Sequence, residues 1–205
     1  MTRHALRSVR RRVPGAYRYV MLVGLPGCGK SAVASILRDE LGYEVIDMSD
    51  LVKEEARRRG RGVDRESLRK TGEELRREMG RSAVAKLVLK KIRELEGEAP
   101  RPGYVISGIR NQEEVDEIKA AFGDEAVCVA IHTPKRLRYL RMLRRGRRGF
   151  DAPTMEEMER QDRREVEFFR MGEPFILADE LIVNSGSLEE LRSRALAVVL
   201  RIPGG

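Results

Sequence analysis

The sequence has few of the residues that build disulfide frameworks, zinc sites and membrane spans. Two cysteines, Cys28 and Cys128, two histidines and no tryptophan occur among its 205 residues. The cysteines show no CxxC spacing, so we expect neither a disulfide nor a structural zinc site, and a reducing, cytoplasmic location is expected. Apolar runs all fall short of the roughly 20 residues that a membrane-spanning helix needs. The N-terminal segment also lacks the apolar stretch of a secretory signal. We therefore expect no membrane association.

Positive charge is abundant but unevenly placed. The formal net charge is +8 at pH 7, from 41 Lys and Arg against 33 Asp and Glu. Residues 1–18 contain six arginines and no acid, so the remainder is nearly balanced. Residues 1–17 are predicted to be a basic, disordered tail, with a solvated tail favoured over one that contacts nucleic acid or anionic lipid. Residues 18–205 have the length of a single domain.

Short apolar runs rich in Val and Ile alternate with longer amphipathic segments. Strands are predicted at residues 17–23, 44–47, 104–107, 126–132 and 181–184. Near-continuous apolar runs are typical of parallel strands that are covered on both faces. The alternation of strands and helices predicts an α/β fold, with a five-stranded parallel sheet and helices on both of its faces.

Several helix ends are visible in the sequence. A helix over residues 30–41 ends before Gly42. Thr133 is predicted to be a helix N-cap, followed by Pro134 at the first helical position. Ser187 with Glu190, and Thr154 with Glu157, each match a capping box.

Two segments are too long to be simple crossover connections. Residues 49–96 are predicted to hold two or three helices, and residues 144–172 are an Arg-rich, largely helical excursion. Inserted segments in a small α/β domain often serve as binding elements or lids. We interpret the first as an acceptor-binding insertion and the second as a lid, with Gly146 and Gly149 as its hinges.

The motif GxxxxGK[ST] is present in "GLPGCGKS", between a predicted strand and a predicted helix. Its glycines allow backbone N–H groups to point at a phosphate, and the helix that follows adds the positive end of its dipole. Lys30 is expected to bridge the β- and γ-phosphates of ATP, and the Ser31 hydroxyl to bind Mg²⁺. The predicted ATP-binding residues are Gly24, Leu25, Pro26, Gly27, Cys28, Gly29, Lys30, Ser31 and Ala32. The fold is therefore expected to be that of a P-loop NTPase.

The stretch "YVMLVGLPGCGKSAVASILRDELGYEVIDMSDLVKEEARRRG" resembles the opening of the adenylate-kinase-like nucleoside monophosphate kinases. From about residue 18 to residue 201 the chain most closely resembles an archaeal family of small adenylate-kinase-related proteins. That resemblance is carried by "LVKEEARRRG", "GEELRREMG", "GIR", "DRRE" and "ADELIVNSGSLEEL". It implies a kinase that uses ATP and Mg²⁺, and it places the turn at residues 184–186 near the adenine of ATP.

A phosphoryl acceptor needs cationic groups that neutralise its own anionic charge. On the helix after the second strand the cationic candidates are Lys53 and Arg57, four residues apart on one face. The resemblance adds Asp50 of the same helix to the expected acceptor-binding residues. Arg110, just past the third strand, is a further candidate, because ligands bind at the carboxyl ends of parallel strands. Arg76 is a weaker one.

The resemblance also shows a departure from the kinase pattern. Ser107 stands where such kinases carry an acid at the end of the third strand. Either the site tolerates weaker metal binding, or Asp47 and Asp50 near the end of the second strand compensate. Ser31 and Asp47 are the predicted ligands of Mg²⁺.

The lid supplies the remaining expected catalytic groups. Arg141 and Arg145 are four apart at a helix end, and Arg163, followed by Arg164, lies on the opposite lid helix. Arginines in this arrangement, together with Lys30, stabilise charge on the phosphoryl group in transfer.

These observations predict a nucleoside monophosphate kinase with AMP as the expected acceptor and small nucleotides as its partners. Two alternatives stay open. Dephospho-CoA kinase is one, because "VIDMSD" matches its acidic site; the other is an ATPase that acts as an RNA- or ribosome-associated module, anchored by the basic tail.

Overall fold

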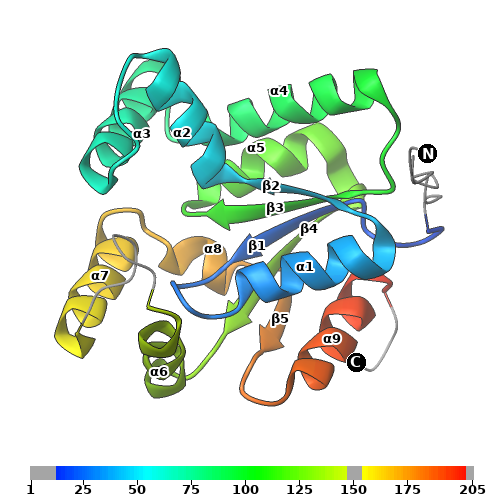
Figure 1. The fold of residues 1–205 in the computed structure, drawn as a ribbon. Helices are drawn as coiled ribbons and strands as arrows, with labels where there is room; N and C mark the ends of the chain where they lie inside the picture. The colour runs from blue at the N-terminus through cyan, green and yellow to red at the C-terminus, as the bar shows by residue number, and fades with distance from the viewer. Residues whose placement is uncertain (1–12, 147–153, 202–205) are drawn as a thin grey trace, which may run out of the picture.

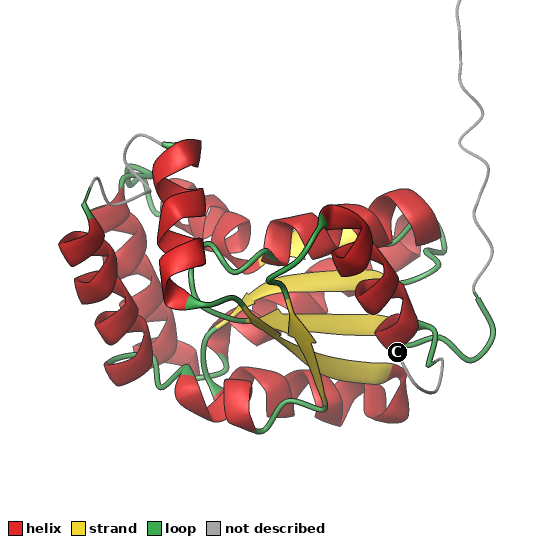
Figure 2. Ribbon diagram, turned by 90° about the horizontal axis from the view of Figure 1, so that it is seen from below, coloured by secondary structure: helices red, strands yellow, loops and turns green. Residues whose placement is uncertain are grey.

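The computed structural model describes residues 13–146 and 154–201, which form a five-stranded parallel sheet covered by helices on both faces (Figures 1 and 2). The order across the sheet is β2-β3-β1-β4-β5. The strands are β1 (Tyr19–Val23), β2 (Glu44–Asp47), β3 (Tyr104–Ile109), β4 (Ala126–His132) and β5 (Glu180–Val183). The predicted fold class is confirmed, and the strand predictions are correct to within two residues at each end.

Two apolar clusters, one on each face of the sheet, hold the helices in place. Side chains of β1 alternate between them: Tyr19, Met21 and Val23 join one cluster, whereas Val20 and Leu22 join the other. Every residue of β1 is at most 2% exposed. Burial of one such Val or Leu side chain stabilises the fold by about 1.5–3 kcal/mol.

Helices α1 (Lys30–Leu41) and α9 (Leu188–Val199) cover one face. Helices α4 (Ala83–Glu98), α5 (Gln112–Phe122) and the short α8 (Gly172–Ile176) cover the other. A 3₁₀ turn, η1 (Gly123–Glu125), leads into β4.

The insertion predicted at residues 49–96 contains α2 (Met48–Arg58), α3 (Arg65–Met79) and most of α4. In the segment predicted as a lid, α6 (Lys135–Arg145) leads in and α7 (Met155–Glu167) leads back towards α8. Both α3 and α7 project beyond the carboxyl ends of the strands (Figure 1). Gly146 ends α6 in a left-handed conformation, while Gly149 lies outside the described residues.

The folded part begins before the expected boundary at residue 18. The Tyr17 N–H donates to the carbonyl of Val199 at 2.9 Å, and the Tyr43 hydroxyl donates to the carbonyl of Tyr17. The Arg201 guanidinium lies 3.9 Å from the centre of the Tyr17 ring. Residues 13–17 of the predicted tail therefore pack on the domain; residues 1–12 lie outside the described part of the chain.

Two of the three capping predictions are confirmed. The Ser187 and Thr154 hydroxyls accept the N–H groups of Glu190 and Glu157, at 3.1 and 3.2 Å. The prediction for Thr133 is wrong: α6 begins at Lys135 without a side-chain cap. The Thr133 hydroxyl instead contacts the P-loop, as described below.

Candidate nucleotide-binding and phosphoryl-transfer site

The loop between β1 and α1 has the backbone conformation that a phosphate-binding loop requires. Gly24 and Gly29 have φ values of 153° and 110°, which L side chains rarely adopt. A Cβ at Gly29 would also lie 2.2 Å from Nδ2 of Asn184, and one at Gly24 would lie 2.6 Å from the carbonyl oxygen of Ile131. The packing around the loop therefore has no room for side chains at these two positions.

Lys30 is the first residue of α1, and Gly29 caps the helix without a side-chain hydrogen bond. The first N–H groups of α1 therefore remain available to an anion. The Lys30 ammonium donates to the carbonyl of Gly24 and lies 3.4 Å from the carbonyl oxygen of Leu25. Ser31 is exposed in the first turn of α1. The loop thus presents its cation and its hydroxyl from neighbouring residues, at the carboxyl end of the central strand.

Two distant segments hold the loop in this shape. The carbonyl of Cys28 accepts hydrogen bonds from the Thr133 hydroxyl at 2.8 Å and from the Asn184 side-chain amide at 2.9 Å. Thr133 and Asn184 are 3% and 6% exposed, and the Thr133 hydroxyl also lies 3.1 Å from the carbonyl oxygen of Asn184. Buried hydrogen bonds of this kind are costly to break, so the ends of β4 and β5 set the position of the loop.

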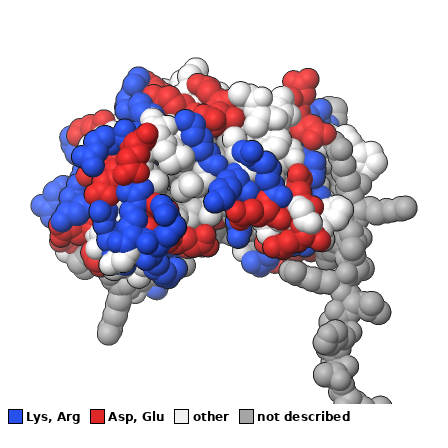
Figure 3. Space-filling model, turned by 90° about the horizontal axis from the view of Figure 1, so that it is seen from above, with Lys and Arg blue, Asp and Glu red and all other residues white. Residues whose placement is uncertain are grey.

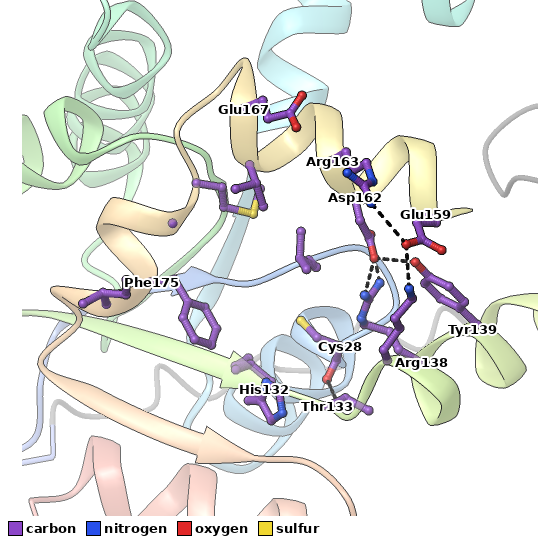
Figure 4. Close-up of a pocket in the computed structure, with 17 residues that line it drawn as sticks. Cys28, His132, Thr133, Arg138, Tyr139, Glu159, Asp162, Arg163, Glu167 and Phe175 are labelled. Carbon is purple, nitrogen blue, oxygen red and sulfur yellow. Dashed lines mark hydrogen bonds and ion pairs between the residues drawn. The ribbon is translucent and has the colours of Figure 1, made fainter. Parts of the chain in front are cut away.

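A third support comes from helices α6 and α7. The Arg138 guanidinium donates to the carbonyl of Pro26 at 2.8 Å and forms a two-pronged ion pair with the Asp162 carboxylate. The Tyr139 hydroxyl donates to the same carboxylate at 2.8 Å (Figure 4). Burial, together with the hydrogen bond to Asp162, raises the pKa of Tyr139 to about 12. The return helix of the predicted lid is thereby tied to the P-loop through one buried guanidinium.

The expected lid arginines have different partners. Arg141 donates to the carbonyl of Asn184 at 3.1 Å, next to the turn at residues 184–186 that the resemblance places near adenine. Arg163 is exposed on α7, with its guanidinium 3.7 Å from the Glu159 carboxylate. Arg145 is exposed at the end of α6. The structure therefore places Arg141 at the P-loop side and Arg163 beside a cavity.

That cavity has a volume of about 530 Å³ and lies between the P-loop, the end of β4 and helices α6 to α8 (Figure 4). Leu25, Cys28 and Phe175 contribute apolar surface, and Asp162 and Arg163 contribute charge. The cavity borders the P-loop at Leu25 and Cys28.

Asp47 ends β2, and its carboxylate accepts the N–H of Ser49 at 2.9 Å and so caps α2. Asp47 is in register with Ser107 of β3. The Lys53 ammonium donates to the Asp50 carboxylate at 2.7 Å, so the positive charge of Lys53 is already compensated. Arg57 is exposed one turn further along α2.

Arg110 follows β3, which is the direct neighbour of β1. Its guanidinium lies 4.4 Å from the centre of the Phe169 ring, and its Nε is 3.8 Å from the Glu165 carboxylate. The Arg76 guanidinium of α3 lies 5.2 Å from the centre of the same ring. Arg110 and Arg76 therefore converge on one point between α3 and the segment that follows α7.

Elsewhere on the surface, charges of opposite sign are mixed. Figure 3 shows acidic and basic side chains interspersed on the side where α2, α3 and α4 lie. Arg59, which directly follows α2, by itself pairs with Glu55, Glu74 and Glu78. Charges of both signs are therefore mixed on this face.

The described residues contain no group of three or more His, Cys, Asp or Glu placed to hold a metal. Ser31 and Asp47 supply oxygen atoms, which are the ligands that Mg²⁺ prefers alongside phosphate and water oxygens. Their chemistry fits a magnesium ion bound mainly through a nucleotide. Within the same described residues, no helix is long and apolar enough to cross a bilayer.

Sequence reasoning missed Arg138, Asp162, Glu114 and Phe169. Arg138 is one of six arginines between residues 136 and 147 that local patterns do not distinguish. Thr133 did carry a signal, but the neighbouring proline favoured its interpretation as a helix cap.

Comparisons with known proteins agree with this geometry. Residues 23–159 match the family model described as an AAA domain. A UPF0200 protein of Thermococcus gammatolerans is 36% identical over 187 residues, covering 91% of this chain and 96% of the relative. One from Aeropyrum pernix is 40% identical over 176 residues, covering 86% and 89%.

Solved structures show the same fold at low identity. TT1252 from Thermus thermophilus superposes with a TM-score of 0.63 at 23% identity, over 93% of this chain and 100% of its own. The shikimate kinase of Acinetobacter baumannii gives a TM-score of 0.56 at 20% identity, over 93% and 97%. The fold is therefore that of P-loop kinases. The chain itself belongs to the archaeal UPF0200 family and contains a P-loop NTPase domain.

Proposed function

We propose that this protein is a phosphotransferase that uses ATP and Mg²⁺ to phosphorylate a nucleoside monophosphate, with AMP as the expected acceptor. One observation carries the proposal. The neighbouring parallel strands β1 and β3 each end in a group suited to an anion: the P-loop after β1, and Arg110 after β3. The groups proposed to bind the donor phosphate and the acceptor phosphate therefore follow adjacent strands. Phosphoryl transfer requires the two phosphates to be held close together.

In this proposal residues 24–32 bind the phosphates of ATP through backbone N–H groups. Lys30 leaves the loop carbonyls that it contacts and bridges the β- and γ-phosphates. Ser31 and Asp47 would hold Mg²⁺, which supplies charge neutralisation on the phosphate oxygens. The Asp47 carboxylate can do so through the oxygen that does not cap α2, since Oδ1 is the atom that accepts the Ser49 N–H.

The lid would neutralise charge and exclude water. Arg141, Arg145 and Arg163 are the proposed partners of the phosphoryl group in transfer. Exclusion of water matters because an open site hydrolyses ATP instead of passing its phosphate to the acceptor. The ion pair of Arg138 with Asp162 supports closure, because Arg138 of α6 links Asp162 of α7 to the P-loop carbonyl of Pro26.

The acceptor would bind between α2, α3 and the end of β3. Arg110 is the proposed ligand of the acceptor phosphate, and Lys53 and Arg57 line the side formed by α2. Because Asp50 already pairs with Lys53 at 2.7 Å, we propose that Asp50 orients this ammonium.

The test is ADP formation from Mg·ATP with a panel of acceptors: AMP, CMP, UMP, GMP, their deoxy forms and dephospho-CoA, each beside a control without acceptor. Strong stimulation by one monophosphate is expected. Turnover with dephospho-CoA alone would show that the acceptor is dephospho-CoA and not a nucleoside monophosphate. ATP hydrolysis that no acceptor changes would contradict the proposal that the protein phosphorylates a small molecule.

The same assay separates the kinase from a nucleotide-dependent RNA-binding module. Deletion of residues 1–12, which leaves the packed Tyr17 in place, should not change acceptor-dependent transfer. Stimulation of ATP hydrolysis by RNA, lost in the truncated chain, would favour the RNA-associated function.

A further inference from the structure

Arg76 and Arg110 are joined by one buried carboxylate. Glu114 of α5 is 0% exposed; its Oε2 accepts the backbone N–H of Arg110 at 2.8 Å, and its Oε1 lies 3.4 Å from Nη2 of Arg76. Asn111 caps α5 by accepting the N–H of Glu114 at 2.9 Å and is itself 1% exposed. These contacts hold Glu114 in place. Its two carboxylate oxygens in turn position the backbone N–H of Arg110 and the guanidinium of Arg76.

The Arg76 guanidinium has more donors than the protein satisfies. Its Nη1 donates to the carbonyl of Gly72 at 3.2 Å, and its bond to Glu114 is long at 3.4 Å. Its Nε is buried and has no hydrogen-bond partner among the described residues. Burial lowers the pKa of Arg76, although an arginine remains charged in a protein. A mostly buried cation with free donors is costly unless a ligand completes it.

Phe169 shows that the two guanidinium groups point to the same place. They lie 5.2 and 4.4 Å from the centre of its ring, and this ring comes from the segment after α7. Arg170, the next residue, has a φ of 58°, an uncommon conformation for a residue other than glycine. Phe169 thus contacts a guanidinium of α3 and the guanidinium that follows β3 from the segment after α7.

The Arg110 guanidinium is likewise incompletely paired. Its Nε lies 3.8 Å from Oε2 of Glu165, beyond hydrogen-bonding distance. That carboxylate oxygen is buried and without a hydrogen-bond partner among the described residues. Glu165 therefore compensates the charge of Arg110 without occupying its donors.

We propose that Arg76 and Arg110 together bind the anionic group of the acceptor, that this group is a phosphate monoester, and that Glu114 positions both arginines. The inference rests on the proposed function and adds a second binding residue to it. Two guanidinium groups from separate elements match the several oxygens that a phosphate presents on one centre. Phe169 covers the pair from the lid side and limits competition by water, and Glu165 competes with the acceptor for Arg110.

The test compares Arg76→Gln with Arg77→Gln, a matched control on the same helix whose side chain is exposed. For Arg76→Gln, KM for AMP should rise roughly tenfold to hundredfold, the range expected for lost charge-assisted hydrogen bonds, with KM for ATP unchanged. Arg77→Gln should match the unmodified protein. Equal KM values for AMP in the two variants would overturn the inference while leaving the kinase function intact.

Direct binding separates this inference from the proposed function. Inorganic phosphate is titrated calorimetrically into the full chain with the P-loop occupied by a non-hydrolysable ATP analogue, because phosphate would otherwise also bind to the free N–H groups of that loop. Phosphate binding that is lost in Arg76→Gln but kept in Arg77→Gln supports the anion site even if no acceptor is phosphorylated. Phosphate binding that is the same in both variants contradicts it.

Glu165→Gln provides a second variant should Arg76→Gln fold poorly. Removal of the competing carboxylate should tighten phosphate binding several-fold and lower KM for AMP. Unchanged or weaker binding in a folded Glu165→Gln protein would contradict the proposed competition at Arg110.

Discussion

The ion pair between Arg138 and Asp162 allows a quantitative test of how the lid helix supports the P-loop. In Asp162→Ala, Arg138 loses both of its carboxylate contacts and keeps only the 2.8 Å bond to the carbonyl of Pro26. The Arg138 side chain is 4% exposed and that of Asp162 is 14% exposed. Loss of one partner of a buried ion pair costs about 3–5 kcal/mol. Because one strong acceptor remains, we expect a loss near 3 kcal/mol in the free energy of unfolding.

Equilibrium unfolding in urea measures this loss, and in a domain of this size it lowers Tm by roughly 6–12 °C. Arg160→Ala is the control: it removes an exposed cation of the same helix whose ion pair spans 4.0 Å, and it should change stability by less than about 0.5 kcal/mol. The double variant Arg138→Met with Asp162→Ala should lose less than the sum of its single variants, because no buried charge is left unpaired. Additive losses, or a loss below about 1 kcal/mol in Asp162→Ala, would refute the reasoning.

Two further predictions concern the P-loop and the pairing of α2. Gly29→Ala places a Cβ 2.2 Å from Nδ2 of Asn184, at a φ of 110° that alanine rarely adopts. The substitution should therefore weaken ATP binding at least tenfold, as measured by titration with a fluorescent ATP analogue. Unchanged affinity would contradict the packing described for the loop. The pKa of Glu55 is lowered from 4.5 to about 2, mainly by its hydrogen bonds from Arg58. Burial opposes this shift, and the hydrogen bond from Arg59 adds to it. A lowered pKa in the folded state stabilises the protein above the unfolded pKa, and that stabilisation is lost as the pH falls towards 2. Glu55→Gln should therefore have a lower Tm than the unmodified protein at pH 7, by a margin that shrinks between pH 4.5 and 2; a margin that stays constant with pH would argue against the ion pairs as its cause.

The sheet and the P-loop are predictable from the sequence because their signals are local. Runs such as "YVMLV" and "AVCVAIH" are buried on both faces, and they carry the apolar pattern that this burial requires. The glycines of the P-loop are needed for the backbone conformation and for the close packing around the loop, and a short motif records them directly. The helix caps at Ser187 and Thr154 are equally local, since each hydroxyl contacts a residue three positions away.

The supports of the site could not be predicted, because their partners are distant in the sequence. Thr133 contacts Cys28, 105 residues away, and this tertiary contact uses the hydroxyl that was predicted to cap α6, which begins at Lys135. Arg76 and Glu114 are 38 residues apart, on helices whose periodicity does not show which faces meet. Lys53 was predicted as a substrate-binding cation from its spacing from Arg57, but this spacing did not reveal that the Lys53 ammonium pairs with Asp50.

The measurement that tests the central claim most directly is the destination of the γ-phosphate of ATP. The protein is incubated with γ-³²P-labelled ATP, Mg²⁺ and AMP, and the labelled products are separated; Lys30→Met serves as the inactive comparison. The account predicts label in ADP formed from AMP, dependent on both AMP and Lys30. Label found only in inorganic phosphate, at a rate that AMP does not change, would contradict it.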